Sequence, residues 1–166
     1  MTRAEVTEFY REHNRALYNT AYRILGDSGE AEEVMQDTIL KFLSAEGRFE
    51  AEAQVRAWLK RTCIRAAIDR LRERRRREAF LEDYAAAEEM VEEEGGGLPA
   101  PDAGRIREAM MQLGEPYRLV LSLVLLEGLD YAEIAAMTGK KEVTLRSLYS
   151  RGRGKLAAML KKEMNG

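Results

Sequence analysis

The sequence is short of cysteine, histidine and proline, and each shortage excludes a class of protein. One cysteine, Cys63, cannot form a disulfide within the chain, so no disulfide framework holds the fold together. One histidine, His13, leaves few ligands for a transition-metal site. Only 3 prolines among 166 residues leave long stretches free to form helix. We expect Cys63 to be a buried packing residue rather than a reactive thiol, because its neighbours are apolar residues at helical spacing.

Long hydrophobic runs and catalytic constellations are also missing. No stretch approaches the roughly 20 apolar residues that a membrane-spanning helix needs, and residues 1–18 lack the apolar core of an export signal. We therefore expect a cytoplasmic protein without membrane insertion. The GRGKL segment at residues 152–156 is too short for a phosphate-binding loop, and His13 has no apparent nucleophile partner. These features predict no enzyme, no cofactor, no metal and no small-molecule substrate.

Charge is nearly balanced over the whole chain but strongly separated along it. The formal net charge is −2, yet residues 60–77 hold nine basic and two acidic residues. Residues 140–166 hold eight basic and two acidic residues, and residues 78–94 hold eight acidic residues and no basic one. Two basic blocks, each ending a helical segment, predict contact with a polyanion in two places. Each block alone also fits a solvated helix face.

Apolar spacing predicts three helices in a first domain, residues 1–77. The expected helices cover residues 6–25, 29–44 and 55–77, with a loop at 47–54. Gly26 ends the first helix, and Asp27 with Glu30 predicts a capping box at the start of the second. In the third helix the inner face includes Leu59 and Ile68. We expect the run RLRERRRR at residues 70–77 to leave the core altogether.

A flexible acidic linker is predicted over residues 78–104. Its three glycines at 95–97 are followed by Pro99 and Pro101, which do not fit a helix interior. As a random coil it spans about 30 Å on average, enough to hold two domains apart. The overall prediction is an all-α fold with two small helical domains.

The second domain, residues 105–166, is predicted to contain a helix-turn-helix. Its helices are expected at residues 104–113, 117–127, 131–138 and 142–164, with Pro116 in the first turn of the second helix. Asp130 and Glu133 predict a capping box at the start of the third helix. No strand is predicted anywhere.

The helix-turn-helix prediction depends on small and apolar residues at fixed spacing. Ala135 allows two helices to approach closely, and Gly139 allows the left-handed turn between them. Ile134 and Leu145 are expected to pack the helices together. Polar residues at 138 and 140 occupy positions that are usually apolar in this motif. A plain helical hairpin remains the alternative.

In a helix-turn-helix the second helix lies in the DNA major groove. Its polar and basic side chains are then expected to contact bases or phosphates: Lys141, Thr144, Arg146, Ser147, Ser150, Arg151 and Arg153. Neither the pattern nor the charge identifies the DNA sequence.

Three segments, in order, resemble the bacterial extracytoplasmic-function (ECF) sigma factors of the sigma-70 family. YREHNRALYNTAYRILGDSGEAEEVMQDTILKFL at residues 10–43 is similar to the first stretch of the family pattern. VRAWLKRTCIRAAIDRLRERRRR at residues 55–77 is similar to the second. Residues 116–156 are similar to the C-terminal promoter-binding domain. Leu148 replaces a frequent arginine of that domain, and we expect it to join the contact that Leu145 makes between the helices.

The resemblance implies partners and site residues. It implies docking of the second helix on the core RNA polymerase through Glu32, Glu33, Gln36, Asp37, Leu40 and Lys41. It implies binding of the melted −10 promoter element by Trp58, Lys60, Arg61, Arg65, Arg70 and Arg72. We favour a packing role for Trp58 over base stacking. The family also implies a linker that threads the polymerase cleft, promoter DNA bound at the −35 element by the second domain, and an anti-sigma factor as a further partner.

Two other functions fit parts of the sequence. An autonomous helix-turn-helix regulator would use its N-terminal helices to dimerise or to sense a ligand. A sigma-like adaptor would bind polymerase without reading a promoter. The basic third helix favours the sigma-factor hypothesis, because neither alternative requires it.

Overall fold

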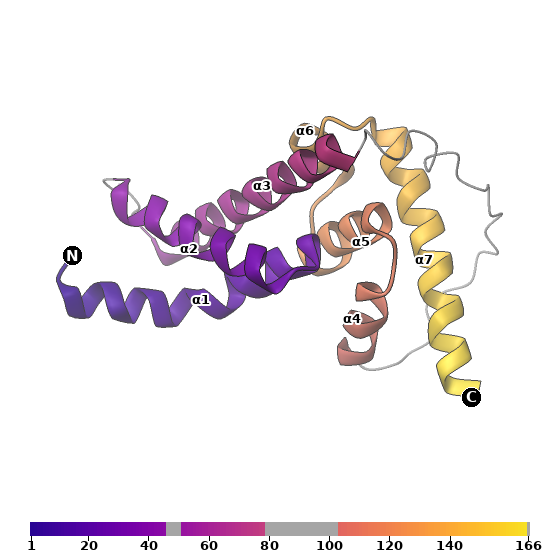
Figure 1. The fold of residues 1–166 in the computed structure, drawn as a ribbon, viewed down its shortest axis with the longest axis horizontal. Helices are drawn as coiled ribbons and strands as arrows, with labels where there is room; N and C mark the ends of the chain where they lie inside the picture. Colours follow the sequence, from indigo (N-terminus) through magenta and orange to yellow (C-terminus); the bar gives the residue numbers. More distant parts are fainter. Residues whose placement is uncertain (46–50, 79–102, 166) are drawn as a thin grey trace. The chain divides into compact units, whose positions relative to one another are not determined.

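The computed structural model describes residues 1–45, 51–78 and 103–165 (Figure 1). The chain divides into two compact units, Met1–Leu81 and Glu82–Gly166. Every regular element of the described residues is a helix, which confirms the all-α prediction. Residues 47–50 of the predicted loop at 47–54, and almost all of the predicted linker, lie outside the described residues. Residues 52–54 of that loop belong to a helix instead, so this part of the loop prediction is wrong.

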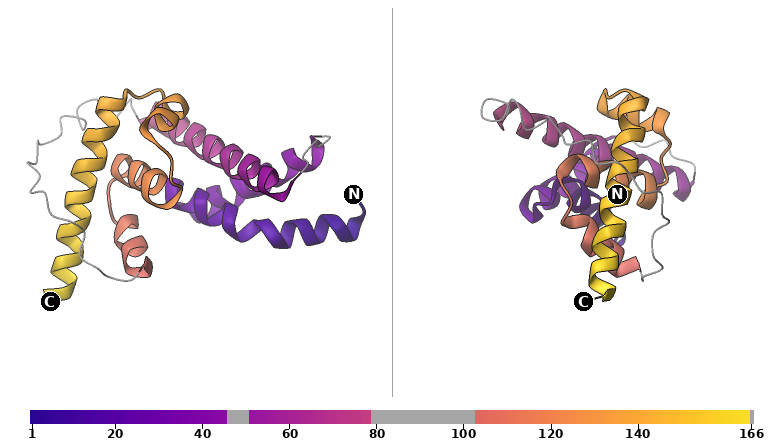
Figure 2. Two further views of the ribbon diagram at one scale, coloured as in Figure 1. Left: turned by 180° about the vertical axis from the view of Figure 1, so that it is seen from behind. Right: turned by 90° about the vertical axis from the view of Figure 1, so that its right-hand side faces the viewer.

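In the described residues of the first unit, 1–45 and 51–78, three helices pack against one another (Figures 1 and 2). They are α1 (Arg3–Leu25), α2 (Ser28–Ser44) and α3 (Glu52–Glu78). Helix α1 begins three residues earlier than predicted, because Thr2 Oγ1 accepts a 3.2 Å hydrogen bond from the Glu5 backbone N–H and the Glu5 carboxylate accepts one from Thr2. Helix α3 also begins three residues earlier than predicted. Gly26 ends α1 at φ 68°, as expected.

Apolar side chains from all three helices form the core of this unit. They include Phe9, Leu17, Ala21, Ile24, Val34, Ile39, Leu59, Ile64 and Ile68, all buried. Cys63 is fully buried and donates a 3.4 Å hydrogen bond from Sγ to the Leu17 carbonyl. The prediction of a packing role for Cys63 is confirmed.

The arginine-rich end of α3 stays on the core, so the prediction that it leaves the bundle is wrong. Leu71 is buried at 3% exposure. Arg74 donates a 3.0 Å hydrogen bond to the Leu25 carbonyl at the end of α1 and forms an ion pair with Glu30. Even in a charged run, about one position per helical turn faces the neighbouring helices, and long side chains keep their stems there.

Glu30 also changes the predicted cap of α2. Asp27 Oδ1 accepts a 2.8 Å hydrogen bond from the Glu30 backbone N–H, so half of the predicted capping box forms. The Glu30 carboxylate turns to Arg74 instead of returning to the Asp27 backbone. An ion pair between distant parts of the sequence therefore takes the place of a local hydrogen bond.

Over residues 103–165, the described part of the second unit contains four α-helices and one π-helical turn. They are α4 (Ala103–Met111), α5 (Glu115–Leu121), η1 (Ser122–Leu126), α6 (Tyr131–Thr138) and α7 (Glu142–Asn165). Pro116 lies in the first turn of α5, as predicted. The helix expected at residues 117–127 is not regular, because the Glu127 N–H bonds the Ser122 carbonyl at 3.1 Å, five residues back.

Helix α7 packs against α4, α5 and α6. Its residue Gly152 is buried against α5. A Cβ atom at this position would lie 3.1 Å from Tyr117 Cβ and 3.2 Å from Leu121 Cδ1. The absence of a side chain at Gly152 therefore allows the two helices to meet, a role that the sequence analysis missed.

Candidate nucleic-acid and polymerase interfaces

The turn between α6 and α7 has the predicted helix-turn-helix geometry. At the start of α6, Asp130 Oδ1 accepts a 2.8 Å hydrogen bond from the Glu133 backbone N–H, and Glu133 Oε1 accepts one of 3.1 Å from Asp130. At its end, Gly139 adopts φ 76° and donates its N–H to the Ala135 carbonyl at 2.8 Å. Both local predictions, the capping box and the left-handed glycine, are confirmed.

The polar residues beside Gly139 are part of this turn. Thr138 Oγ1 donates a 2.8 Å hydrogen bond to the Ile134 carbonyl and accepts one of 3.2 Å from the Lys140 backbone N–H. The hydroxyl therefore bonds both a carbonyl of α6 and a backbone N–H of the turn. A polar residue at position 138 is compatible with an ordered turn.

Apolar side chains hold the two helices of the motif together. Ile134 and Leu145 are fully buried, as predicted. Leu148 is 9% exposed, so it too is buried with the core of this unit. The outward face of α7 is therefore left to other residues.

The residues predicted to contact the −35 element differ in exposure. Four are exposed near the start of α7, namely Lys141, Thr144, Arg146 and Ser147. Three further along the helix are half-buried, namely Ser150, Arg151 and Arg153. Val143 is 71% exposed on the same helix, and it was not among the predicted contacts. An exposed branched side chain at the start of such a helix suits contact with a thymine methyl group.

Arg146 has two neighbours that define where its guanidinium lies. Its Cζ atom is 5.4 Å from the centroid of the Tyr131 ring, which comes from α6. Its Nη2 atom is 3.7 Å from Glu142 Oε1, one turn earlier on α7. Tyr131 also packs edge-on against Tyr149 with ring centroids 6.3 Å apart. Burial raises the pKa of Tyr131, and the positive charge of Arg146 opposes that rise.

The predicted polymerase-binding residues all lie exposed on α2. They are Glu32, Glu33, Gln36, Asp37, Leu40 and Lys41. Leu40 is 59% exposed, so this acidic helix presents a large apolar side chain to solvent. The six side chains together offer negative charge and one apolar contact to a partner.

The predicted −10 residues on α3 do not share one environment. Lys60, Arg61, Arg65 and Arg72 are exposed. Arg70 is instead turned toward α2, where its Nη1 lies 2.7 Å from Glu33 Oε2 and its Nη2 lies 3.8 Å from Asp37 Oδ2. The hydrogen bond to Glu33 is the main cause that holds the pKa of Arg70 above its ordinary value.

Trp58 belongs to an aromatic cluster at one end of the first unit. Its ring meets that of Phe42 edge-on, with centroids 5.7 Å apart, and Phe42 stacks on Phe9 at 4.6 Å. The ring of His13 lies 4.5 Å from that of Phe9. Trp58 is half-buried, so the structure gives it the packing contacts that the sequence analysis favoured.

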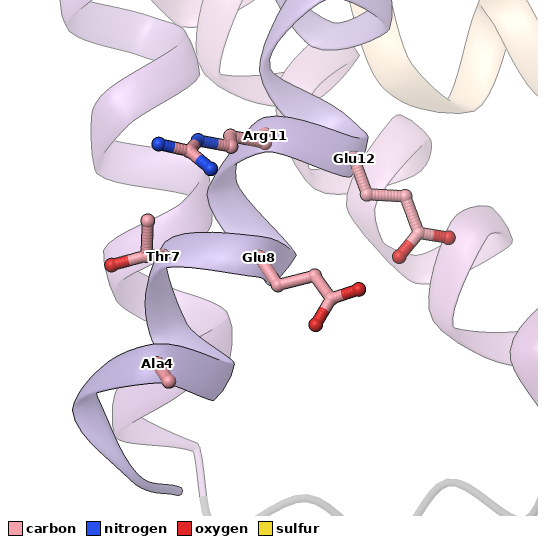
Figure 3. Close-up of a pocket in the computed structure, with 5 residues that line it drawn as sticks. All are labelled: Ala4, Thr7, Glu8, Arg11 and Glu12. Atoms are coloured by element: carbon pink, nitrogen blue, oxygen red, sulfur yellow. The ribbon is translucent and has the colours of Figure 1, made fainter.

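The described hollows do not resemble an enclosed substrate site. One lies on the first turns of α1 and is lined by Ala4, Thr7, Glu8, Arg11 and Glu12 (Figure 3). All five residues are exposed, and the figure shows Arg11 pointing away from Glu8. In the described parts of the chain no group of three or more metal-ligating side chains was found. No helix within the same ranges is long and apolar enough to cross a bilayer.

Two helical units, one with a helix-turn-helix whose second helix carries basic side chains, define a DNA-binding protein of the all-α class. The family Sigma-70 region 2 matches residues 9–77, and the family Sigma-70, region 4 matches residues 103–156. The chain belongs to the sigma-70 family, in its ECF group, and it is an RNA polymerase sigma factor rather than an enzyme.

Individual relatives agree with this assignment. ECF RNA polymerase sigma factor SigM of Mycobacterium tuberculosis is 31% identical over 155 residues, which cover 92% of this chain and 76% of the relative. SigW of Bacillus subtilis is 24% identical over 174 residues, covering 95% and 88%. Among solved structures, the sigma factor RpoE from Bartonella quintana, crystallised with the anti-sigma factor NepR, is similar with a TM-score of 0.56. It is 25% identical, and the match covers 95% of this chain and 97% of that one.

Proposed function

We propose that the chain is divided into two promoter-binding domains with separate tasks. Residues 1–77 bind core polymerase and the −10 element, residues 105–166 bind the −35 duplex, and residues 78–104 link them. The observation that carries this proposal is the well-formed helix-turn-helix with the exposed Thr144, Arg146 and Ser147 on its second helix.

In this proposal α2 docks on the polymerase. Its exposed carboxylates suit a basic partner surface, and Leu40 supplies apolar area that is buried on binding. Such a site tolerates substitution without loss of folding, because none of its six residues belongs to the core.

The exposed basic side chains of α3 bind the single strand that forms when the −10 element melts. Lys60, Arg61, Arg65 and Arg72 supply a positive track for its phosphates. Arg70 joins this track only when it leaves Glu33, so its contribution is expected to be smaller than that of the exposed cations.

The proposal extends to partners and location. The structural relative from Bartonella was crystallised with an anti-sigma factor, which supports a similar protein inhibitor for this chain. Because its polymerase partner acts on chromosomal DNA, we place the protein in the cytoplasm.

The experiment combines gel filtration with bacterial core polymerase and run-off transcription on a pool of promoter fragments. Co-elution with transcripts from a defined subset of fragments is the expected result. Co-elution without transcripts would instead indicate an adaptor, and a dimer that binds duplex DNA without polymerase would indicate an autonomous regulator.

Matched variants locate the polymerase surface. Leu40→Ser is expected to reduce co-elution, since it removes exposed apolar area without opening a cavity. Glu8→Ala, at an exposed position on α1, serves as the control and is expected to leave co-elution unchanged. Equal co-elution of both variants would remove Leu40 from the interface.

A further inference from the structure

We infer that Tyr131 is a positioning residue for Arg146 and thereby a determinant of −35 sequence preference. This inference rests on the proposed function of the second domain. Tyr131 lies on α6, the first helix of the motif, and Arg146 lies on α7, the helix proposed to contact the bases. Tyr131 therefore acts on base recognition from outside the recognition helix.

The contact between the two side chains is a cation–π interaction. Arg146 Cζ lies 5.4 Å from the Tyr131 ring centroid, within the roughly 6 Å range of such contacts. Tyr131 is half-buried, and its ring is held in turn by the edge-on contact with Tyr149. Because Tyr149 restricts the Tyr131 ring, the ring gives the Arg146 guanidinium an ordered surface to pack on.

Fixing the guanidinium matters because a free arginine side chain has many rotamers. Ordering it on DNA therefore costs side-chain entropy. The side chain of Arg146 is 59% exposed, and its contact with its own helix is the exposed ion pair with Glu142. The Tyr131 ring restricts it before DNA arrives, and binding then loses less entropy.

The same contact leaves the reading groups of Arg146 available. The cation–π contact involves the charge of the guanidinium and uses none of its N–H groups as a hydrogen-bond donor. Two of these N–H groups can therefore donate to a guanine O6 and N7. Glu142, whose Oε1 is 3.7 Å from Nη2, makes only a loose exposed ion pair that DNA can replace.

The test is a double-mutant cycle in the full chain bound to core polymerase. Binding is measured on a promoter and on variants in which each −35 base pair is changed singly. Arg146→Ala first identifies the base pair whose preference depends on that arginine. Tyr131→Leu keeps the apolar bulk beside Tyr149 and removes the aromatic face, whereas Tyr131→Phe keeps the face and is the matched control.

Tyr131→Leu is expected to reduce preference at that one base pair by about threefold to tenfold, and Tyr131→Phe to leave it unchanged. In an Arg146→Ala background, Tyr131→Leu is expected to have no further effect on preference. A purely structural role of Tyr131 would give a different result, because binding to all promoter variants would fall equally, in both backgrounds.

Failures of the inference and of the proposed function are distinguishable. If the wild-type complex shows no preference at any −35 base pair, the proposed function of the second domain is wrong, and the inference is wrong with it. If wild-type preference is present but Arg146→Ala does not alter it, or Tyr131→Leu retains it fully, only the inference is overturned.

Discussion

Arg70 on α3 donates a 2.7 Å hydrogen bond to Glu33 on α2, and the two residues belong to different proposed interfaces. Glu33 lies on the surface proposed for polymerase, and Arg70 was predicted to contact the −10 strand. In the unbound chain each partner therefore neutralises the other. A polymerase that takes up Glu33 would release Arg70 toward DNA.

The first prediction concerns this pair. Glu33→Gln is expected to raise the affinity of the free chain for single-stranded DNA and to make log K fall more steeply with log salt, by about 0.7 for one added phosphate contact. Glu32→Gln is the matched control, because it changes the net charge equally but Glu32 accepts its 3.4 Å hydrogen bond from Gln36. Fluorescence anisotropy at several salt concentrations provides the measurement. Identical slopes for the two variants would contradict the release of Arg70.

The second prediction concerns Arg74, which joins the end of α1 to the start of α2. Arg74→Met is expected to lower the free energy of unfolding by about 1–3 kcal/mol, because the Leu25 carbonyl and the Glu30 carboxylate lose a charged donor. Arg77→Met, whose side chain is 74% exposed, is expected to change it by at most about 0.5 kcal/mol.

Urea unfolding followed by tryptophan fluorescence measures both variants. Trp58 is the single tryptophan of the chain and lies in the first unit, so its signal reports that unit. Equal stabilities of the two variants would show that the bonds of Arg74 contribute no more than those of a surface residue.

The third prediction concerns the contact between α5 and α7. Gly152→Ala adds a Cβ atom 3.1 Å from Tyr117 Cβ, and relieving this contact is expected to cost about 1–3 kcal/mol. The gain in helix propensity, about 1 kcal/mol, offsets only part of that cost. Ala158→Gly, at an exposed position of the same helix, measures the propensity term separately. Thermal unfolding, monitored by circular dichroism, provides the measurement. A Gly152→Ala variant more stable than the wild type would contradict the prediction.

The fourth prediction concerns the turn of the helix-turn-helix. Gly139→Ala is expected to destabilise the second unit by about 1 kcal/mol, because alanine strains at φ 76°. Gly139→Asn is expected to lose less, since asparagine tolerates the left-handed region better. Thermal unfolding of the two variants ranks them, and a more stable alanine variant would show that the turn relaxes to another conformation.

Local signals were the part of the fold that sequence could predict. Asp130 and Glu133 are three residues apart, so their capping box depends on a few dihedral angles only, and Gly139 follows the same logic. The signal at Thr2 and Glu5 was equally local and was missed only because the apolar pattern begins later. Arg74 lies 44 residues from Glu30, and no short-range pattern indicates which arginine of the run pairs with it.

In the candidate sites too, the sequence predicts which residues are exposed but not which residues of different helices are in contact. The helical period alone predicts that the acidic residues of α2 lie on the surface, and in the structure they are exposed. The contact of Tyr131 with Arg146 joins two helices across a turn, and the tie between Arg70 and Glu33 joins two helices of a bundle. Both depend on how helices pack, which periodicity does not determine.

The burial of Cys63 makes its thiol a probe of how often the first unit opens. Its thiol is the only one in the chain and is fully buried, so a thiol reagent reaches it only when the first unit opens. The labelling rate in native buffer therefore measures the opening equilibrium of that unit without denaturant. Any partner that binds the closed form slows the reaction in proportion to its occupancy. Binding of a partner to α1–α3 can therefore be detected as a slower labelling rate of Cys63.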